Sequence, residues 1–140
     1  MISKNFICIA CIMAVFSAPL FAQEQQEITI IKTLVRLRNE HKADSAGLYF
    51  ADTVVRYMKY LRNVPRSKIV ASDKAFWKAH PGNRFEITGP VNILLRNGQT
   101  VGIITGKEYL DGTSYKRERI EIIFNKNKKI ISYRGFNIGN

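Results

Sequence analysis

The sequence contains few of the residues that most often carry chemistry. Its 140 residues include only two cysteines and two histidines, and both cysteines, Cys8 and Cys11, lie among the first 22 residues. No apolar run of 18 residues follows residue 22, so no membrane-spanning helix is expected there. Acidic residues are also scarce, with 11 Asp and Glu against 22 Lys and Arg, a formal charge of +11. This length and composition predict one basic domain, because a second core of useful size does not fit.

The first 22 residues, MISKNFICIACIMAVFSAPLFA, have the layout of a secretory signal peptide. A basic residue, Lys4, is followed by an apolar stretch and small residues up to Ala22, and then by the polar run QEQQE. The pattern predicts cleavage near Ala22 and export of residues 23–140 to the periplasm or the extracellular space. The alternatives are a first core helix, a permanent anchor, or a lipoprotein acylated at Cys11. A chain cut after Ala22 has no cysteine and hence no disulfide or thiolate ligand.

Hydrophobic spacing predicts helices first and a sheet afterwards. Helices are expected over 24–40, 44–50 and 67–79, with Asp44 and Ser67 as N-caps and a strand over 53–60 between the second and third helix. Four runs of strand-forming residues follow, separated by turn-forming residues such as Asn97-Gly98 and bent once at Gly89-Pro90; these runs span 84–96, 99–110, 114–125 and 128–138. This order predicts an α+β fold in which N-terminal helices pack on a curved, mainly antiparallel sheet.

The segment AGLYFADTVVRY, residues 46–57, resembles the helix-to-strand turn of the nuclear transport factor 2-like superfamily, also called the cystatin-like cone fold. The chain also resembles a bacterial subgroup of exported or accessory domains. This second resemblance rests on Tyr57, Asp73-Lys74, Phe76, Pro81, Arg84-Phe85 and Gly89-Pro90. The resemblance implies one domain over 23–140, a cone with an internal cavity, and a homodimer formed through the sheet. The superfamily includes both enzymes and binding domains, so the resemblance alone implies no activity.

The known enzyme patterns of this superfamily are not matched. Ketosteroid isomerases have an acidic base near the end of the first strand, where this chain reads Val-Arg-Tyr-Met at 55–58. Sites like that of scytalone dehydratase need converging His and Asp, but His41 and His80 are expected at helix ends. Sites like that of limonene epoxide hydrolase need Asp-Arg-Asp on strands, and the only Asp of the strand region is the turn residue Asp111.

The predicted ligand pocket combines aromatic residues of the cone with a charged pair. Tyr57 and Trp77 are expected to face one another across the cavity, with Arg119 available to fix an anionic ligand; the complete predicted pocket is Tyr57, Trp77, Phe85, Tyr109, Arg119 and Glu121. The alternatives remain open. The aromatic residues also fit an ordinary core, and Arg119 and Glu121 also fit a solvated or dimer-facing sheet surface.

The sequence therefore predicts an exported, non-enzymatic domain that binds a small molecule or a partner protein. The alternative is a lyase or isomerase that uses Tyr57 as donor, Arg119 as anion clamp and Glu121 as base. It requires Glu121 to point into the cavity. No cofactor or metal is predicted, because two isolated histidines make no metal site. Nucleic-acid binding is not predicted either, since the basic residues are spread along the sequence. A third hypothesis is attraction to acidic envelope polymers.

Overall fold

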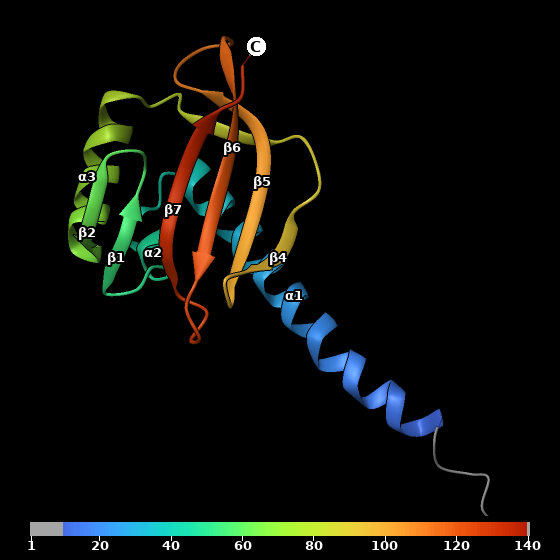
Figure 1. Cartoon of the computed structure of the whole chain (residues 1–140). Helices are drawn as coiled ribbons and strands as arrows, with labels where there is room; N and C mark the ends of the chain where they lie inside the picture. Colours follow the sequence, from blue (N-terminus) through green and yellow to red (C-terminus); the bar gives the residue numbers. More distant parts are fainter. Residues whose placement is uncertain (1–9, 140) are drawn as a thin grey trace, which may run out of the picture.

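The structure, a computed structural model, describes the backbone of residues 10–139 and the side chains of residues 21–139. Most of the predicted signal peptide therefore lies outside the described side chains, and its cleavage stays a prediction. Over residues 10–139 the chain forms three helices and seven strands. In chain order they are α1 Ala10–Asn39, α2 Ala43–Gly47, β1 Thr53–Tyr57, β2 Leu61–Pro65, α3 Arg66–Ala79, β3 Arg84–Ile87, β4 Asn92–Arg96, β5 Gln99–Tyr109, β6 Tyr115–Phe124 and β7 Ile130–Asn137, and Figure 1 shows their arrangement. Among the described residues, none of the helices combines the length and apolar character that a membrane crossing requires.

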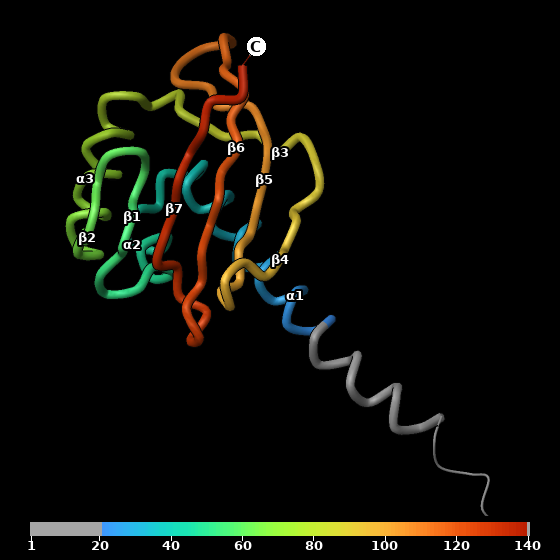
Figure 2. Tube along the Cα trace, viewed as in Figure 1, coloured from blue at the N-terminus to red at the C-terminus, as the bar shows by residue number. Residues whose placement is uncertain are grey.

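All seven strands form one sheet in the order β2-β1-β7-β6-β5-β3, and β4 also pairs with β5. Neighbouring strands are antiparallel except β1 and β7, which run parallel through the pairs Arg56↔Ser132 and Tyr57↔Tyr133. Figure 2 shows β1 beside β7, although 76 positions separate the paired residues Arg56 and Ser132. The sheet is therefore mixed, and the predicted α+β class with a mainly antiparallel sheet is confirmed.

Two parts of the predicted strand pattern were wrong. Residues 53–60 form no single strand, because the chain turns at Met58, which has a φ of 57°, and returns as β2. The predicted strand over 84–96 is two strands, β3 and β4, which pair with the two halves of β5 on either side of Gly89-Pro90. Proline has no N–H to donate to a strand ladder, so the interruption at this position has a physical cause. Asn97 and Gly98 form the predicted tight turn, both with positive φ.

The helices follow the predicted pattern with shifted ends. The backbone of α1 is helical from Ala10, upstream of the predicted start at residue 24. Neither predicted N-cap is observed, because α2 begins after Lys42 and α3 begins after Pro65. Proline suits this position, since its fixed φ is compatible with a helix start and a helix start needs no donor there. Asp44 lies instead in the first turn of α2.

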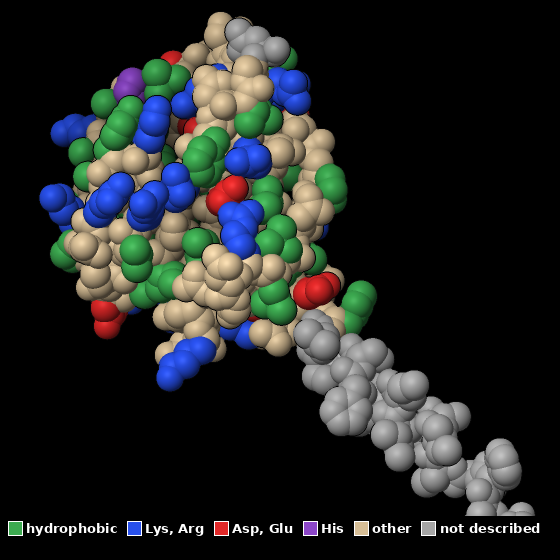
Figure 3. Space-filling model, in the orientation of Figure 1, with side chains coloured by type: hydrophobic (Ala, Val, Ile, Leu, Met, Phe, Trp, Pro, Cys, Tyr) green, Lys and Arg blue, Asp and Glu red, His purple; other side chains and the backbone are tan. Residues whose placement is uncertain are grey.

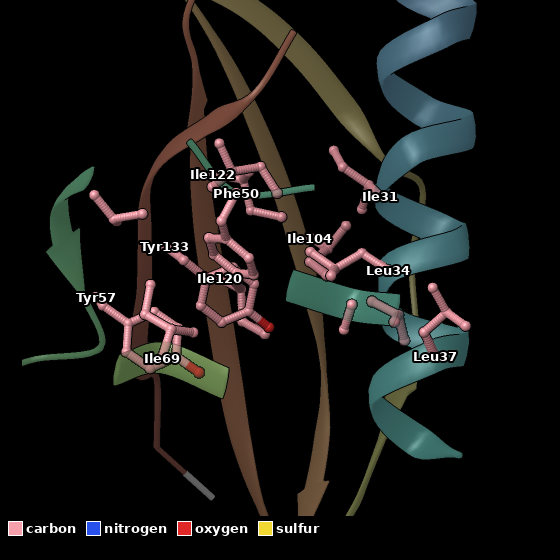
Figure 4. Close-up of a cluster of buried hydrophobic side chains, with 14 of the residues drawn as sticks. Ile31, Leu34, Leu37, Phe50, Tyr57, Ile69, Ile104, Ile120, Ile122 and Tyr133 are labelled. Carbon is pink, nitrogen blue, oxygen red and sulfur yellow. The ribbon is translucent and has the colours of Figure 1, made fainter. Parts of the chain in front are cut away.

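The core lies between α1 and one face of the sheet, which is called the inner face below. Figure 4 shows Ile31, Leu34 and Leu37 of α1 pointing toward the strands, as their helical spacing requires. Opposite them are side chains of β5, β6 and β7, with Phe50, Tyr57 and Ile69 completing the cluster. The sheet therefore buries its inner face against the helices, and its other side is called the outer face.

Candidate functional site

A cavity of about 480 Å³ lies between the C-terminal end of α1 and the inner face of β5, β6 and β7. Its apolar wall consists of Val35, Met58, Phe76, Phe85, Leu110 and Ile120. Its polar wall consists of Arg38, Asn39, Asn83, Glu108, Ser114, Tyr115, Lys116, Glu118, Tyr133 and the backbone of Gly135. An apolar cavity of this size with a few converging polar groups is typical of a small-molecule site.

Arg38 connects three elements around the cavity. Its Nη1 donates to Asp73 Oδ2 on α3 at 2.7 Å and to the Tyr57 hydroxyl on β1 at 3.1 Å. The Tyr57 hydroxyl in turn donates to Asp73 Oδ1 at 2.5 Å. The side chains of Arg38 and Asp73 are only 13% and 8% exposed. Because Asp73 compensates the charge of Arg38, the guanidinium adds little net charge to the cavity.

The surroundings of this network keep its hydroxyl groups protonated. Burial raises the pKa of Tyr57 well above its usual range, although the nearby Arg38 charge opposes the shift. Burial also raises the pKa of Tyr133, to about 12, again against the effect of Arg38. Burial disfavours the charge of Arg38 itself, but the neighbouring Tyr57, Tyr133 and Asp73 outweigh it and raise its pKa. The guanidinium also lies over the Trp77 and Tyr133 rings, at 5.2 and 5.0 Å from their centres.

Two carboxylates, Glu108 on β5 and Glu118 on β6, supply the acidic part of the cavity wall. Glu118 is paired across the sheet with Gly106, and Glu108 with Lys116, so the two glutamates are diagonal neighbours on the inner face. Lys116 Nζ lies 3.7 Å from Glu118 Oε1. Burial raises the pKa of Glu108; the hydrogen bond from Asn83 opposes this rise, and the charge of Glu118 adds to it.

Two asparagines fix the wall behind these groups. Asn39 makes a two-way contact with the backbone of Phe85, donating to its carbonyl at 2.9 Å and accepting from its N–H at 2.8 Å. Asn83 accepts from Trp77 Nε1 at 3.1 Å and donates to Glu108 Oε1 and to the carbonyl of Tyr109. Since both asparagine side chains are held from two sides, the chain's own hydrogen bonds fix this part of the wall.

Three of the six predicted pocket residues lie at or beside this cavity. Phe85 lines it directly. Tyr57 and Trp77 are buried next to it and both contact Arg38, one through a hydrogen bond and the other through its ring face. The structure therefore brings Tyr57 and Trp77 together around Arg38, a residue that the sequence-based pocket did not include. That these residues bind a ligand stays a prediction.

The other three predicted residues, Tyr109, Arg119 and Glu121, lie on the outer face. Arg119 and Glu121 alternate along β6 with Ile120 and Ile122, which are buried against the helices. Arg119 pairs with Glu121 at 3.3 Å, and Arg96 also contacts Glu121, at 3.1 Å. The structure does not bring this pair together with Tyr57. The lyase or isomerase hypothesis built on Tyr57, Arg119 and Glu121 therefore has no common site here.

The sequence-based pocket missed Arg38, Asp73, Glu108 and Glu118. A signal for Glu118 was present, because it shares a strand face with Ile120, Ile122 and Phe124, and that apolar set must face the helices. Arg38 and Asp73 carry no such signal, since 35 positions separate them in the sequence. Over the part of the chain that the structure describes, no group of three or more His, Cys, Asp or Glu side chains could hold a metal ion.

Comparison with solved structures gives the fold but no activity. A cystatin-like protein of the nuclear transport factor 2-like type from Novosphingobium aromaticivorans is similar, with a TM-score of 0.65 and 10% identity over 96% of this chain and 92% of that one. A cystatin-like protein of unknown function from Methylobium petroleophilum has a TM-score of 0.64 and 15% identity, over 81% of this chain and 76% of that one. The chain therefore has the cystatin-like cone fold.

A third similar structure comes from Agrobacterium tumefaciens, with a TM-score of 0.61 and 20% identity over 82% of this chain and 99% of that one. Its name proposes an isomerase of the SnoaL-like family. No protein-family model and no curated protein matches this chain. These likenesses show the fold alone and leave the function to be argued from the site.

Proposed function

We propose that the protein is an exported domain that binds a small molecule in the cavity beside Arg38. The cavity volume of about 480 Å³ is within the range of sites for small organic ligands. Its wall is apolar on one side. On the other side Asn83 donates to Glu108, and Asn39 holds the backbone of Phe85. A ligand with an apolar body and one polar end fits this division of the wall.

The observation that carries the proposal further is the pair of carboxylates, Glu108 and Glu118, in a chain with a formal charge of +11. The charge of Arg38 is compensated by Asp73, and Lys116 lies near Glu118, so Glu108 has no cation of its own in this set. The polar end of the ligand is therefore expected to be an amine, which donates to Glu108 and favours its charged form.

The first test is native mass spectrometry of the protein purified without denaturation from the exported fraction of its own cell. A discrete additional mass supports a ligand-binding domain and identifies the molecule. The mass of the protein itself tests export, because removal of residues 1–22 leaves a chain that begins at Gln23. A full-length chain found only inside the cell contradicts the export part of the proposal.

The second test uses paired probes, an arylalkyl amine that is protonated at neutral pH and the alcohol of the same shape, with affinity measured by calorimetry. Glu108→Gln is expected to weaken amine binding about 10- to 100-fold, since a charged hydrogen bond contributes about 1.5–3 kcal/mol. Glu121→Gln is the matched control, because Glu121 lies on the outer face. Equal binding of amine and alcohol, or equal effects of the two variants, contradicts the assignment.

One observation favours a second candidate, a proton-transferring enzyme of lyase or isomerase type. Glu108 has a raised pKa and lies in a cavity, which are the properties of a general acid or base. This candidate predicts that a ligand recovered by native mass spectrometry exchanges a carbon-bound proton in deuterated water with the wild type and not with Glu108→Gln. A bound ligand that undergoes neither proton exchange nor turnover contradicts the enzyme and supports the binding domain.

A further inference from the structure

We propose that the outer face of the sheet docks onto an anionic lipid bilayer surface. The feature behind this proposal is a concentration of basic side chains that the sequence does not reveal. In Figure 3, which has the orientation of Figure 1, Lys and Arg side chains are spread over β2, β1, β7 and β6. The strand pairings place on this one face the side chains of Arg56, Arg62, Arg84, Arg96, Lys107, Arg117, Arg119 and Arg134.

The paired strands contribute few acidic side chains to this face. Glu86 lies opposite Lys107, and Glu121 lies opposite Arg134. Glu121 already forms ion pairs with Arg96 and Arg119, with N–O distances of 3.1 and 3.3 Å. Eight cations therefore face two carboxylates, and the strong excess of positive charge favours an anionic partner.

A second copy of this chain fits the face poorly. A symmetric dimer places the same patch of both subunits against each other. Through the outer face it would bring the arginines of one copy against those of the other, with only Glu86 and Glu121 on each side to compensate them. Like charges that face one another across an interface weaken the binding free energy by several kcal/mol, so a partner of opposite charge is favoured.

The layout of the cations favours a plane over a linear polymer. From β2 to β3 there are five strand spacings of about 4.8 Å, or about 24 Å across the sheet. Along β5, the distance from Gln99, which is paired with Arg96, to Lys107 is eight residues at about 3.3 Å, or about 26 Å. A single polymer chain crosses such an array along one line, whereas a bilayer surface contacts cations on several strands at once.

The aromatic side chains of this face argue against single-stranded nucleic acid. Bases stack on free ring faces, but Arg119 and Arg134 lie over Phe136, at 5.3 and 4.6 Å from its centre. Arg84 covers Tyr109 in the same way, at 3.8 Å. Tyr115, which also lines the cavity, is half-exposed beside this cluster, and Lys107 Nζ lies 4.7 Å from its ring centre. A tyrosine with an apolar body and a polar end suits the headgroup region of a membrane.

The test measures co-sedimentation of the exported protein, purified as for native mass spectrometry, with phosphatidylcholine vesicles that either contain or lack phosphatidylglycerol. The variant Arg62→Gln/Arg117→Gln/Arg134→Gln removes one cation each from β2, β6 and β7. The control Lys32→Gln/Lys68→Gln/Lys78→Gln removes the same charge from exposed positions on α1 and α3. Each cation near an anionic membrane changes binding roughly fivefold, so the outer-face variant is expected to bind about 100-fold more weakly.

Binding to the phosphatidylglycerol vesicles that fades with added salt, and that the outer-face variant loses while the helix control keeps it, supports the proposal. Equal losses in the two variants, or equal binding to neutral vesicles, overturn it. Tighter binding to a single-stranded oligonucleotide or to polyglutamate than to the vesicles also overturns it, as does a dimer that the outer-face variant converts to monomer. These outcomes are independent of the cavity, because none of the substituted residues lines it.

Discussion

Arg38 and Asp73 form a buried ion pair, 2.7 Å apart, that ties the end of α1 to the middle of α3. Tyr57 completes the pair by donating to one carboxylate oxygen while it accepts from the guanidinium. Two oppositely charged groups that are so little exposed depend on one another, because either of them alone would be a buried charge without compensation. The wall of the cavity therefore depends on Asp73, although Asp73 itself does not line it.

The first prediction is that Asp73→Asn strongly destabilises the protein. The substitution leaves the Arg38 charge buried without its partner, and the expected loss in free energy of unfolding is about 3 kcal/mol. Asp44→Asn is the matched control, because the Asp44–Lys74 pair joins α2 and α3 at the surface and should contribute less than about 1 kcal/mol. Urea unfolding followed by circular dichroism measures both, and equal effects would show that the buried pair contributes no more than a surface pair.

The second prediction concerns pH. Because burial raises the pKa of Glu108 in the folded protein, the unfolded chain loses this proton at a lower pH than the folded chain does. The stability that Glu108 contributes is thus complete below its ordinary pKa of 4.5 and is lost as the pH rises through the raised value. Glu108→Gln removes this dependence, so its stability relative to the wild type should improve from acidic to neutral pH.

Urea unfolding midpoints measured at a series of pH values test this prediction. Glu24→Gln, at an exposed position of α1, controls for the loss of one negative charge. A wild type that gains stability relative to Glu108→Gln as the pH rises would contradict the sign of the predicted shift.

The third prediction compares two glycines that face the interior. A Cβ at Gly106 would collide with the carbonyl oxygen of Glu86 and with the Phe85 ring, so backbone or a packed ring must move. A Cβ at Gly135 would meet only the carboxylate end of Glu118, which can rotate away. Gly106→Ala is therefore expected to cost about 1–3 kcal/mol of stability, whereas Gly135→Ala should cost little and instead weaken ligand binding by displacing Glu118.

Thermal unfolding and probe affinity, measured on both glycine variants, separate the two effects. Gly106→Ala should lower the unfolding temperature by several degrees, since about 1 kcal/mol corresponds to roughly 4 °C in a domain of this size. A Gly135→Ala variant that is as unstable as Gly106→Ala, or one that binds the amine probe like the wild type, would contradict the prediction.

Much of the fold could be predicted because its signals are local. Helical spacing identified α1 and α3, and the Asn97-Gly98 pair identified the turn between β4 and β5. The hairpin between β1 and β2 could not be predicted in the same way, because it depends on Met58 adopting a positive φ that favours glycine. The parallel pairing of β1 with β7 is a contact between distant parts of the chain, for which a single sequence carries no signal.

The candidate site was predicted less well, for two different reasons. Arg119 and Glu121 lie on the outer face of β6, whereas Glu118 lies at the cavity on the inner face, together with the apolar residues of that strand. Arg38 and Asp73 could not be paired from sequence spacing. The same holds for the outer-face cations, which look dispersed along the chain and gather only when the strands pair.

The last prediction concerns Glu27, whose side chain on α1 is only 2% exposed. Its Oε1 lies 3.2 Å from Nζ of Lys128 in the turn before β7, and its Oε2 has no hydrogen-bond partner among the described residues.

Lys128→Met removes the cation while keeping a side chain of similar length at the same positive φ. The substitution should lower the free energy of unfolding by about 3 kcal/mol, because it leaves a buried carboxylate uncompensated. Lys126→Met, at an exposed position of the same turn, is the control. Adding Glu27→Gln to Lys128→Met should restore part of the loss, because the buried charge is then gone. Urea unfolding of the three variants measures these differences, and a Lys128→Met variant as stable as Lys126→Met would show that the pair does not hold α1 to the sheet.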